Sequence, residues 1–153
     1  MSLISALANV HHQGQFGDFE DKKGDDLLQI SEKKNLLIVQ IVQFKNSKIP
    51  IESIDIDGLK LKDSSLNVAF NENTRILWNG PKNWLLVSSN KDLIKSISLT
   101  CKETDFAVTD LSHSRAVIEI EGNYVLEVLK KGSPFNFDIL KKNNSINSLY
   151  NNI

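Results

Sequence analysis

The sequence holds a single cysteine, Cys101, among 153 residues. One cysteine cannot form a disulfide within the chain, and it excludes zinc sites that are built on cysteine pairs. A chain without internal disulfides favours a reducing compartment, so we expect a cytoplasmic location. Lys102 lies beside Cys101, but we interpret the thiol as a buried spacer rather than a nucleophile.

Long apolar stretches and a strong net charge are also missing. The longest apolar run, residues 36–42, is interrupted by Gln40 and is too short to cross a bilayer. The N-terminus has no basic segment followed by an apolar core, so it does not resemble a signal peptide. A net charge of −1 gives no field that would attract nucleic acid or an acidic membrane. We therefore expect neither as a partner.

What the sequence does contain is a succession of strand-like and helix-like segments. Residues 35–44 are rich in β-branched residues and apolar on both faces, which predicts a buried strand. Two apolar stretches within 75–89 flank Asn79-Gly80-Pro81-Lys82, which predicts a β-hairpin. Residues 51–61 are ambiguous between helix and strand, and Gly58 fits a helix end. Residues 106–112 and 116–121 read as two further strands, the second half-buried with Ile118 and Ile120 on one face.

Three helices are expected. The first is a short amphipathic helix at 3–8. The second begins at an Asn90 cap and runs to about Leu99, and its buried face carries Leu93, Ile94 and Ile97. The third begins at an Asn123 cap and stops at Gly132, and its buried stripe consists of Val125, Leu126, Val128 and Leu129.

This order of elements predicts an α+β fold with a largely antiparallel sheet and helices packed on it. The length is that of one domain, and no linker rich in proline or serine divides it, so we expect a single domain over residues 1–153. Residues 11–26 carry three glycines and many charges, which favours a loop. We expect residues 1–30 to form a loosely packed N-terminal arm.

The segment 110–122, DLSHSRAVIEIEG, places Asp110, Ser112, His113 and Arg115 close together and suggests a hydrolase. In a strand, however, adjacent residues such as Ser112 and His113 point to opposite faces, whereas a catalytic dyad needs both side chains within hydrogen-bond reach. No nucleophile elbow is present either. The favoured interpretation is a structural corner, in which Asp110 and Ser112 bind backbone groups.

Other candidate sites are weaker. Consecutive histidines at 11 and 12 lack the spacing and the third ligand of a firm metal site. The segment GQFGDF (14–19) is not a phosphate-binding loop, because no strand precedes it and the spacing is wrong. Trp78 and Trp84 fit a core position and a partner surface equally well. We therefore expect no catalytic, cofactor-binding or metal-binding residue in this chain.

Several segments together resemble the gamma subunit of heterotetrameric sarcosine oxidase. They are TRILWNGPKNWLLVSS (74–89), the segment 108–138 with its Asp–x–Ser–x–x–Arg corner and Gly122, and IDGLKL (56–61). That family is in turn similar to the folate-binding domain of the glycine-cleavage aminomethyltransferases. The resemblance implies the same fold here, and it makes Trp78, Trp84, Asp110, Ser112, Arg115 and Gly122 structural or interface candidates.

The resemblance implies a non-catalytic accessory role. The family's complex oxidatively demethylates sarcosine to glycine and passes the methyl carbon to tetrahydrofolate. Its alpha, beta and delta subunits would be the partners, and they would hold the FAD, FMN, NAD, tetrahydrofolate and zinc of the complex. Trp78 and Trp84 would then set the hairpin and a docking face, while Asp110 and Arg115 would hold the corner.

Two departures from the pattern bear on this expectation. The aminomethyltransferases use an aspartate upstream of the strand that WLLVSS matches, whereas NVAFNENTR (67–75) offers Asn71, Glu72 and Asn73 instead. An amide cannot act as a general base. Family members also continue beyond the final segment here, so either the lineage is short or the chain is C-terminally incomplete. An uncovered sheet edge would then favour a homo-oligomer when the protein is isolated. The alternative is a stand-alone folate-binding one-carbon protein.

Overall fold

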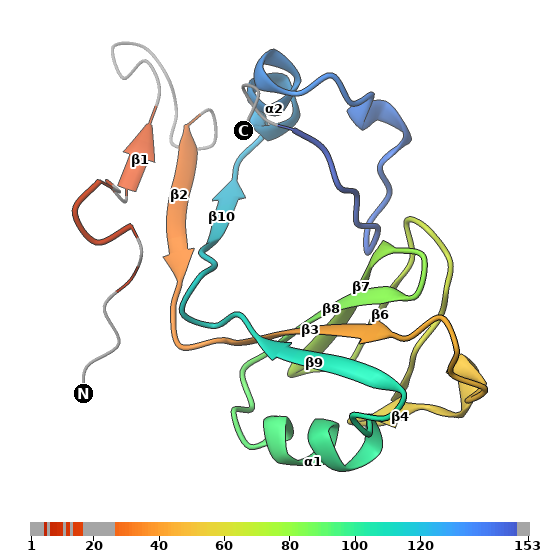
Figure 1. The fold of residues 1–153 in the computed structure, drawn as a ribbon. Coiled ribbons are helices and arrows are strands. Elements are labelled where there is room, and N and C mark those ends of the chain that lie inside the picture. Colours follow the sequence, from red (N-terminus) through yellow and green to blue (C-terminus); the bar gives the residue numbers. More distant parts are fainter. Residues whose placement is uncertain (1–4, 6, 11, 13, 17–26, 150–153) are drawn as a thin grey trace. The chain divides into compact units, whose positions relative to one another are not determined.

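The computed structural model describes residues 5, 7–10, 12, 14–16 and 27–149, and these form two compact units. The first unit is drawn from residues 1–34, 116–140 and 147–153, and the second from 35–115 and 141–146. Figure 1 shows both. The expectation of a single domain stays a prediction, because it concerns whether the two units fold together.

The second unit is built on a five-stranded, entirely antiparallel sheet with the strand order β6-β7-β8-β3-β9. Its strands are β3 (Leu37–Gln43), β6 (Val68–Phe70), β7 (Thr74–Gly80), β8 (Asn83–Ser88) and β9 (Phe106–Asp110). The predicted hairpin is β7–β8, and the predicted strands at 35–44 and 106–112 are β3 and β9. The sequence therefore located four of the five strands, and it did not predict the edge strand β6.

β3 is the strand that explains why this sheet forms. It pairs with β8 on one side and β9 on the other, and Leu37, Val39 and Ile41 are 4%, 0% and 0% exposed. Ile38, which points to the opposite face, is buried as well. A strand that is apolar on both faces is stable only where both faces are covered, as its sequence predicted.

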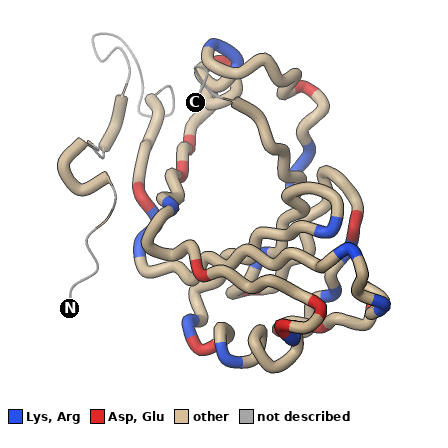
Figure 2. The backbone as a smooth tube through the Cα atoms, viewed as in Figure 1, with Lys and Arg blue, Asp and Glu red and all other residues tan. Residues whose placement is uncertain are grey.

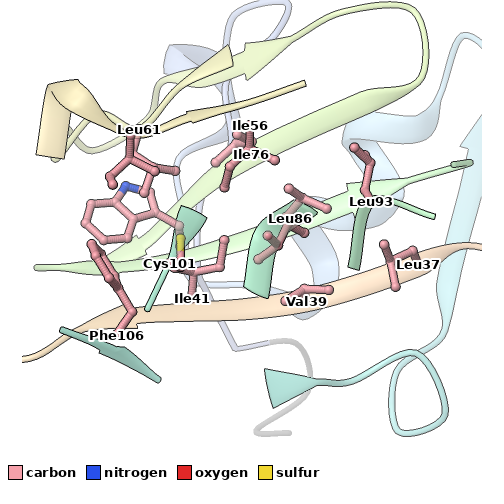
Figure 3. Close-up of a cluster of buried hydrophobic side chains, with 13 residues drawn as sticks. Leu37, Val39, Ile41, Ile56, Leu61, Ile76, Leu86, Leu93, Cys101 and Phe106 are labelled. Atoms are coloured by element: carbon pink, nitrogen blue, oxygen red, sulfur yellow. The ribbon is translucent and has the colours of Figure 1, made fainter. Parts of the chain in front are cut away.

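The core of the second unit lies between one face of this sheet and two smaller elements. These are α1 (Leu93–Thr100) and the hairpin of β4 (Asp55–Ile56) and β5 (Leu59–Lys60). Figure 3 shows how their side chains meet those of β3, β7, β8 and β9. The buried cluster consists of Leu37, Val39, Ile41, Ile54, Ile56, Leu61, Ile76, Trp84, Leu86, Leu93, Ile97, Cys101 and Phe106. Each large apolar side chain fully buried here contributes about 1.5–3 kcal/mol.

Residues 51–61, which the sequence left ambiguous, form a short 3₁₀ helix, η2 (Ile51–Ser53), followed by the β4–β5 hairpin. The turn between the two strands consists of Asp57 and Gly58, with φ angles of 56° and 75°. Positive φ at both central residues is typical of a type I′ hairpin turn, for which Asp-Gly is a favoured pair. The expectation of a helix end at Gly58 was wrong.

The helix α1 confirms the predicted segment and its face, since Leu93 and Ile97 are buried. Its N-cap is Asp92 rather than the predicted Asn90. The Asn90 side chain accepts a hydrogen bond from the Asp92 backbone N–H at 3.0 Å instead. It therefore closes the turn that precedes the helix.

The first unit contains an antiparallel three-stranded sheet with the order β1-β2-β10 and one helix. Its elements are β1 (Gly14–Phe16), β2 (Leu28–Lys33), β10 (Val117–Glu121), α2 (Val125–Gly132) and the 3₁₀ helix η3 (Phe137–Ile139). β1 lies in a stretch predicted to be a loop. Of the helix expected at 3–8, residues 3, 4 and 6 lie outside the described residues, while residues 7–10 form a turn. α2 ends at Gly132 as predicted, but its N-cap is Tyr124 rather than Asn123.

The described apolar side chains of the first unit are mostly half-buried or exposed. Among its described residues only Leu27 and Phe137 are buried apolar residues, and none of the residues of α2 is buried. Leu126, expected in a buried stripe, is 43% exposed, and Ile118 on β10 is 38% exposed. The expected burial of the α2 stripe was therefore wrong. Of the two isoleucines expected on the buried face of β10, only Ile120 is half-buried.

Candidate functional site

The corner that follows β9 is held by hydrogen bonds of Asp110 and Ser112. The Ser112 hydroxyl accepts the backbone N–H of Ile38 at 2.9 Å and donates to Asp110 Oδ1 at 2.5 Å. The same carboxylate oxygen accepts the backbone N–H of Ser112 at 2.9 Å. The Leu111 backbone N–H also donates to the Ile38 carbonyl at 2.7 Å. These bonds continue the pairing of β3 with β9 beyond the last pair, Val39–Asp110, to Ile38.

These hydrogen bonds make Asp110 and Ser112 unsuited to act as a general base and a nucleophile. The hydroxyl and then the backbone N–H of Ser112 lower the pKa of Asp110 below its ordinary value, with a small further effect of the nearby His113. A carboxylate with a lowered pKa is a poor general base near neutral pH. The Ser112 proton is directed to Asp110 and not to a histidine.

His113 and Arg115 are both exposed, and within residues 27–149 neither side chain makes a hydrogen bond or an ion pair. Asp110 and Ser112, not Arg115, therefore hold the corner. β9 and β10 belong to different sheets, so the corner connects two sheets and is not a turn between paired strands as the sequence suggested. The three side chains of a Ser–His–Asp hydrolase do not come together here.

Gly122 has a packing role. Its φ is 132°, and a Cβ built on it would lie 2.6 Å from the backbone oxygen of Leu27. Only glycine tolerates both the positive φ and this close approach of two backbone segments. Gly122 therefore fixes how the end of β10 lies against the residue before β2.

Trp78 and Trp84 are direct cross-strand partners of the β7–β8 hairpin. Trp84 is fully buried, and its indole N–H donates to the Lys62 carbonyl at 2.8 Å. Trp78 is half-buried, and its indole N–H donates to Asp63 Oδ1 at 2.6 Å. Trp84 is thus a core residue, and only Trp78 has surface left for a partner.

The sequence missed a polar cluster that surrounds the turn of the β4–β5 hairpin. Asp57 Oδ2 accepts hydrogen bonds from Thr74 Oγ1 at 2.6 Å and from Asn71 Nδ2 at 3.0 Å. Thr74 Oγ1 also lies 2.9 Å from Ser88 Oγ, and both hydroxyls are buried. The bonds from Thr74 and then Asn71 lower the pKa of Asp57. The Asp-Gly pair signalled the turn, but nothing local signals contacts made 14 and 17 residues away.

No group of three histidine, cysteine or acidic side chains suited to a metal is found within the described part of the chain. His12 is exposed, and residue 11 lies outside the described residues. Cys101 is buried as predicted, and burial raises the pKa of its thiol to about 11. None of the helices formed by described residues is long and apolar enough to span a bilayer.

Basic and acidic positions are interspersed along the backbone of each unit, as Figure 2 shows. The described surface charges of the first unit largely pair with each other, as in Lys33–Glu119 at 2.5 Å and Lys130–Asp138 at 2.9 Å. This distribution agrees with the net charge of −1. Along the described residues it gives no extended segment of one sign that would attract a polyanion.

These features define a small antiparallel α+β protein whose most suggestive polar residues serve as scaffold. No protein-family model matches the sequence, and no curated protein matches it significantly. A solved structure does share the fold: a chain of "Heterotetrameric Sarcosine Oxidase from Corynebacterium sp. U-96 in complex with pyrrole 2-carboxylate". The TM-score is 0.76 at 23% sequence identity, over 86% of this chain and 69% of that chain. The resemblance to sarcosine oxidase inferred from the sequence is therefore confirmed at the level of the fold.

Proposed function

We propose that this chain is the gamma-type accessory subunit of a heterotetrameric sarcosine oxidase. In this role it supports the oxidative demethylation of sarcosine to glycine, with the methyl carbon passing to tetrahydrofolate, and it performs no chemistry itself. FAD, FMN, NAD, tetrahydrofolate and zinc belong to the alpha, beta and delta subunits with which it assembles. The observation that carries the proposal is the fold shared with a chain of such an oxidase over 86% of the present chain.

The state of the candidate corner supports a role without catalysis. Asp110 Oδ1 accepts both the hydroxyl and the backbone N–H of Ser112, and the Ser112 hydroxyl accepts the backbone N–H of Ile38. Their neighbours His113 and Arg115 are exposed, and within residues 27–149 neither forms a hydrogen bond with Asp110 or Ser112. A general acid–base site needs groups that converge on a substrate atom.

The uncovered apolar surface of the first unit supports a role in assembly. Tyr124 and Leu126 near α2, Ile118 on β10 and Ile139 on η3 are 49%, 43%, 38% and 54% exposed. A three-stranded sheet and one helix whose described residues include only two buried apolar side chains have little core of their own. Exposed apolar surface of this kind is typical of a site where another protein packs.

Co-purification from native cells tests the proposal. The tagged full-length chain should retain a flavoprotein that shows flavin absorbance and produces hydrogen peroxide only when sarcosine is added. Recovery of the chain without any flavoprotein contradicts the proposal.

Tetrahydrofolate titration tests the alternative of a stand-alone folate-binding protein. The chain has two tryptophans, so their fluorescence reports binding directly. The accessory role predicts no saturable quenching by micromolar tetrahydrofolate. Saturation at one ligand per isolated chain would support the alternative and contradict the accessory role.

A further inference from the structure

The second unit contains a small cavity of about 110 Å³ beside the β7–β8 hairpin. One wall is the arch, which we define as residues 61–67 between β5 and β6, together with Lys60. The opposite wall is the sheet. The lining residues are Lys60, Lys62, Asn67, Val68, Ala69, Ile76, Trp78 and Trp84.

Two indole N–H groups of the sheet hold the arch by hydrogen bonds. Trp84 donates to the Lys62 carbonyl at 2.8 Å, and Trp78 donates to Asp63 Oδ1 at 2.6 Å. Asp63 Oδ1 also accepts the backbone N–H of Lys82 at 3.3 Å. The far end of the arch is held as well, because Leu66 O accepts the backbone N–H of Ser145 at 3.0 Å. A cavity held in this way is preformed, which removes the ordering cost that a ligand would otherwise meet.

The walls of the cavity combine an apolar floor with a basic rim. Val68, Ala69 and Trp78 are half-buried and supply the accessible apolar surface, and Ile76 and Trp84, which are 3% and 0% exposed, lie behind it. Lys60 and Lys62 are exposed, and within the part of the chain that the structure describes neither takes part in an ion pair. Long lysine stems can cover apolar surface while the ammonium group stays at the edge. Such a rim favours an anionic group at the mouth of the cavity.

The size of the cavity restricts what can enter. An engineered apolar cavity of about 150 Å³ accommodates benzene, which has six heavy atoms. Pockets for drug-sized ligands measure about 300–1,000 Å³. The present cavity is smaller than that engineered cavity. It is therefore too small for a folate or a dinucleotide, and it admits a ligand of at most about six heavy atoms with its polar end at the mouth.

We propose that this cavity binds a small monocarboxylate. The hydrocarbon end of the ligand lies on the half-buried Val68, Ala69 and Trp78. Its carboxylate receives charge-assisted hydrogen bonds from Lys60 and Lys62. This binding site is independent of the accessory role, because it needs neither a partner subunit nor any residue of the corner after β9.

Nuclear magnetic resonance of the full-length chain tests the site with butyrate as the probe. Two tryptophans give two indole N–H signals, and both indoles line the cavity. Butyrate should shift both signals saturably, with a dissociation constant in the millimolar range. Butyramide has the same shape without the charge, and it should bind at least about tenfold more weakly, because the basic rim then has no anion to hold.

Variants of the basic rim provide the decisive comparison. The double substitution Lys60→Gln and Lys62→Gln should weaken butyrate binding at least about tenfold. Lys48→Gln removes an exposed lysine of the same unit that does not line the cavity, and it should leave the affinity unchanged within about twofold. Ala69→Leu should abolish binding by filling the cavity, with an unchanged circular dichroism spectrum as the folding control.

The proposal is overturned if butyrate causes no saturable shift. It is also overturned if butyramide binds as tightly as butyrate, or if the double variant retains the original affinity. The proposal is likewise overturned if sodium chloride at the same concentration causes the same shifts, because the effect would then be general to anions. None of these outcomes depends on whether a flavoprotein co-purifies with the chain.

Discussion

Among single residues, the buried hydroxyls of Thr74 and Ser88 have the clearest energetic role. Thr74 Oγ1 bonds to Asp57 and lies 2.9 Å from Ser88 Oγ, and both residues are about fully buried. Thr74→Val keeps the shape of the side chain but leaves Ser88 and the ionised Asp57 without this partner. We expect the free energy of unfolding to fall by about 1–3 kcal/mol, measured by urea denaturation.

The matched control is Thr74→Ser, which keeps the hydroxyl and removes one methyl group. It should cost less than the valine variant, although it opens a small void. Equal losses for both variants would mean that packing, and not the hydroxyl network, fixes the hairpin turn at Asp57.

Cys101 offers a second measurement at this scale. Its side chain is 2% exposed, and burial raises the pKa of its thiol to about 11. Because the thiolate is the reactive form, an aromatic disulfide reagent at pH 8 should leave the native protein unlabelled and label one thiol per chain in concentrated urea. Rapid labelling of the native protein would show that the thiol is accessible.

The sequence predicted the role of Asp110 and Ser112 because their mutual bonds span two residues and need no knowledge of the rest of the fold. It could not predict the partner of Ser112, since Ile38 lies 74 residues away. The same reason explains the missed cluster around Asp57. Hydrogen bonds between residues close in sequence can be predicted from the local residue types, whereas those between distant residues depend on the strand order.

At the scale of elements, residues typical of tight turns predicted one hairpin correctly, whereas a second hairpin was missed. Asn79-Gly80-Pro81-Lys82 correctly located the β7–β8 hairpin, and Gly80 and Lys82 both have positive φ. The Asp57-Gly58 pair carried a hairpin signal of the same kind, but Ile54, Ile56 and Leu59 fit a helical period equally well. The strands beside that turn are only two residues long, too short for periodicity to reveal them.

The helix α2 was predicted in place but not in environment. Apolar periodicity marks the face that seeks burial, and it does not say which layer covers that face. Leu126 is 43% exposed in this chain. If the accessory role is correct, a partner subunit covers this face.

Leu126→Lys tests this consequence. Capture of the flavoprotein should weaken by about tenfold or more, because a charge replaces an apolar contact in a packed interface. The thermal midpoint of the isolated chain should stay the same within a few degrees, since the leucine is already exposed. The control is Leu99→Lys on α1, where the leucine is 78% exposed and belongs to the second unit. Equal loss of capture in both variants would remove α2 from the docking surface.

At the scale of the whole molecule, the two units differ in how much apolar surface they bury. Every buried apolar residue of the described chain except Leu27 and Phe137 belongs to the second unit. In the isolated chain, backbone amides of β3 and β8 should therefore exchange with solvent far more slowly than those of β2 and β10. Hydrogen exchange followed by mass spectrometry checks this order. Equal protection in both sheets would show that the first unit draws stability from a source other than its own core.

Acid should destabilise the chain in part through Asp57 and Asp110. A third carboxylate, Asp105, also has a lowered pKa, because the hydroxyls of Ser47 and then Thr104 donate to it. The pKa values of Asp57 and Asp110 are lowered in the folded state, so the unfolded state binds more protons at mildly acidic pH. Their contribution is therefore fully present above the unfolded pKa of about 3.9 and is lost as the pH falls through the folded values.

The double substitution Asp57→Asn and Asp110→Asn should flatten the pH dependence of the urea midpoint between about pH 5 and pH 2. The single substitution Glu103→Gln serves as the control and should leave the slope nearly unchanged, because Glu103 is exposed and its side chain makes no hydrogen bond or ion pair with the described residues. A double variant with the slope of the original protein would show that other groups cause the acid sensitivity.

Gly122 has a consequence for how this sequence can change over time. A carbon added at this position would lie 2.6 Å from a backbone oxygen, and its φ of 132° is closed to other residues. Substitutions between lysine and asparagine at exposed positions should be nearly neutral, whereas any substitution of Gly122 should destabilise the contact between the end of β10 and Leu27. We therefore expect glycine to be retained at this position in related sequences.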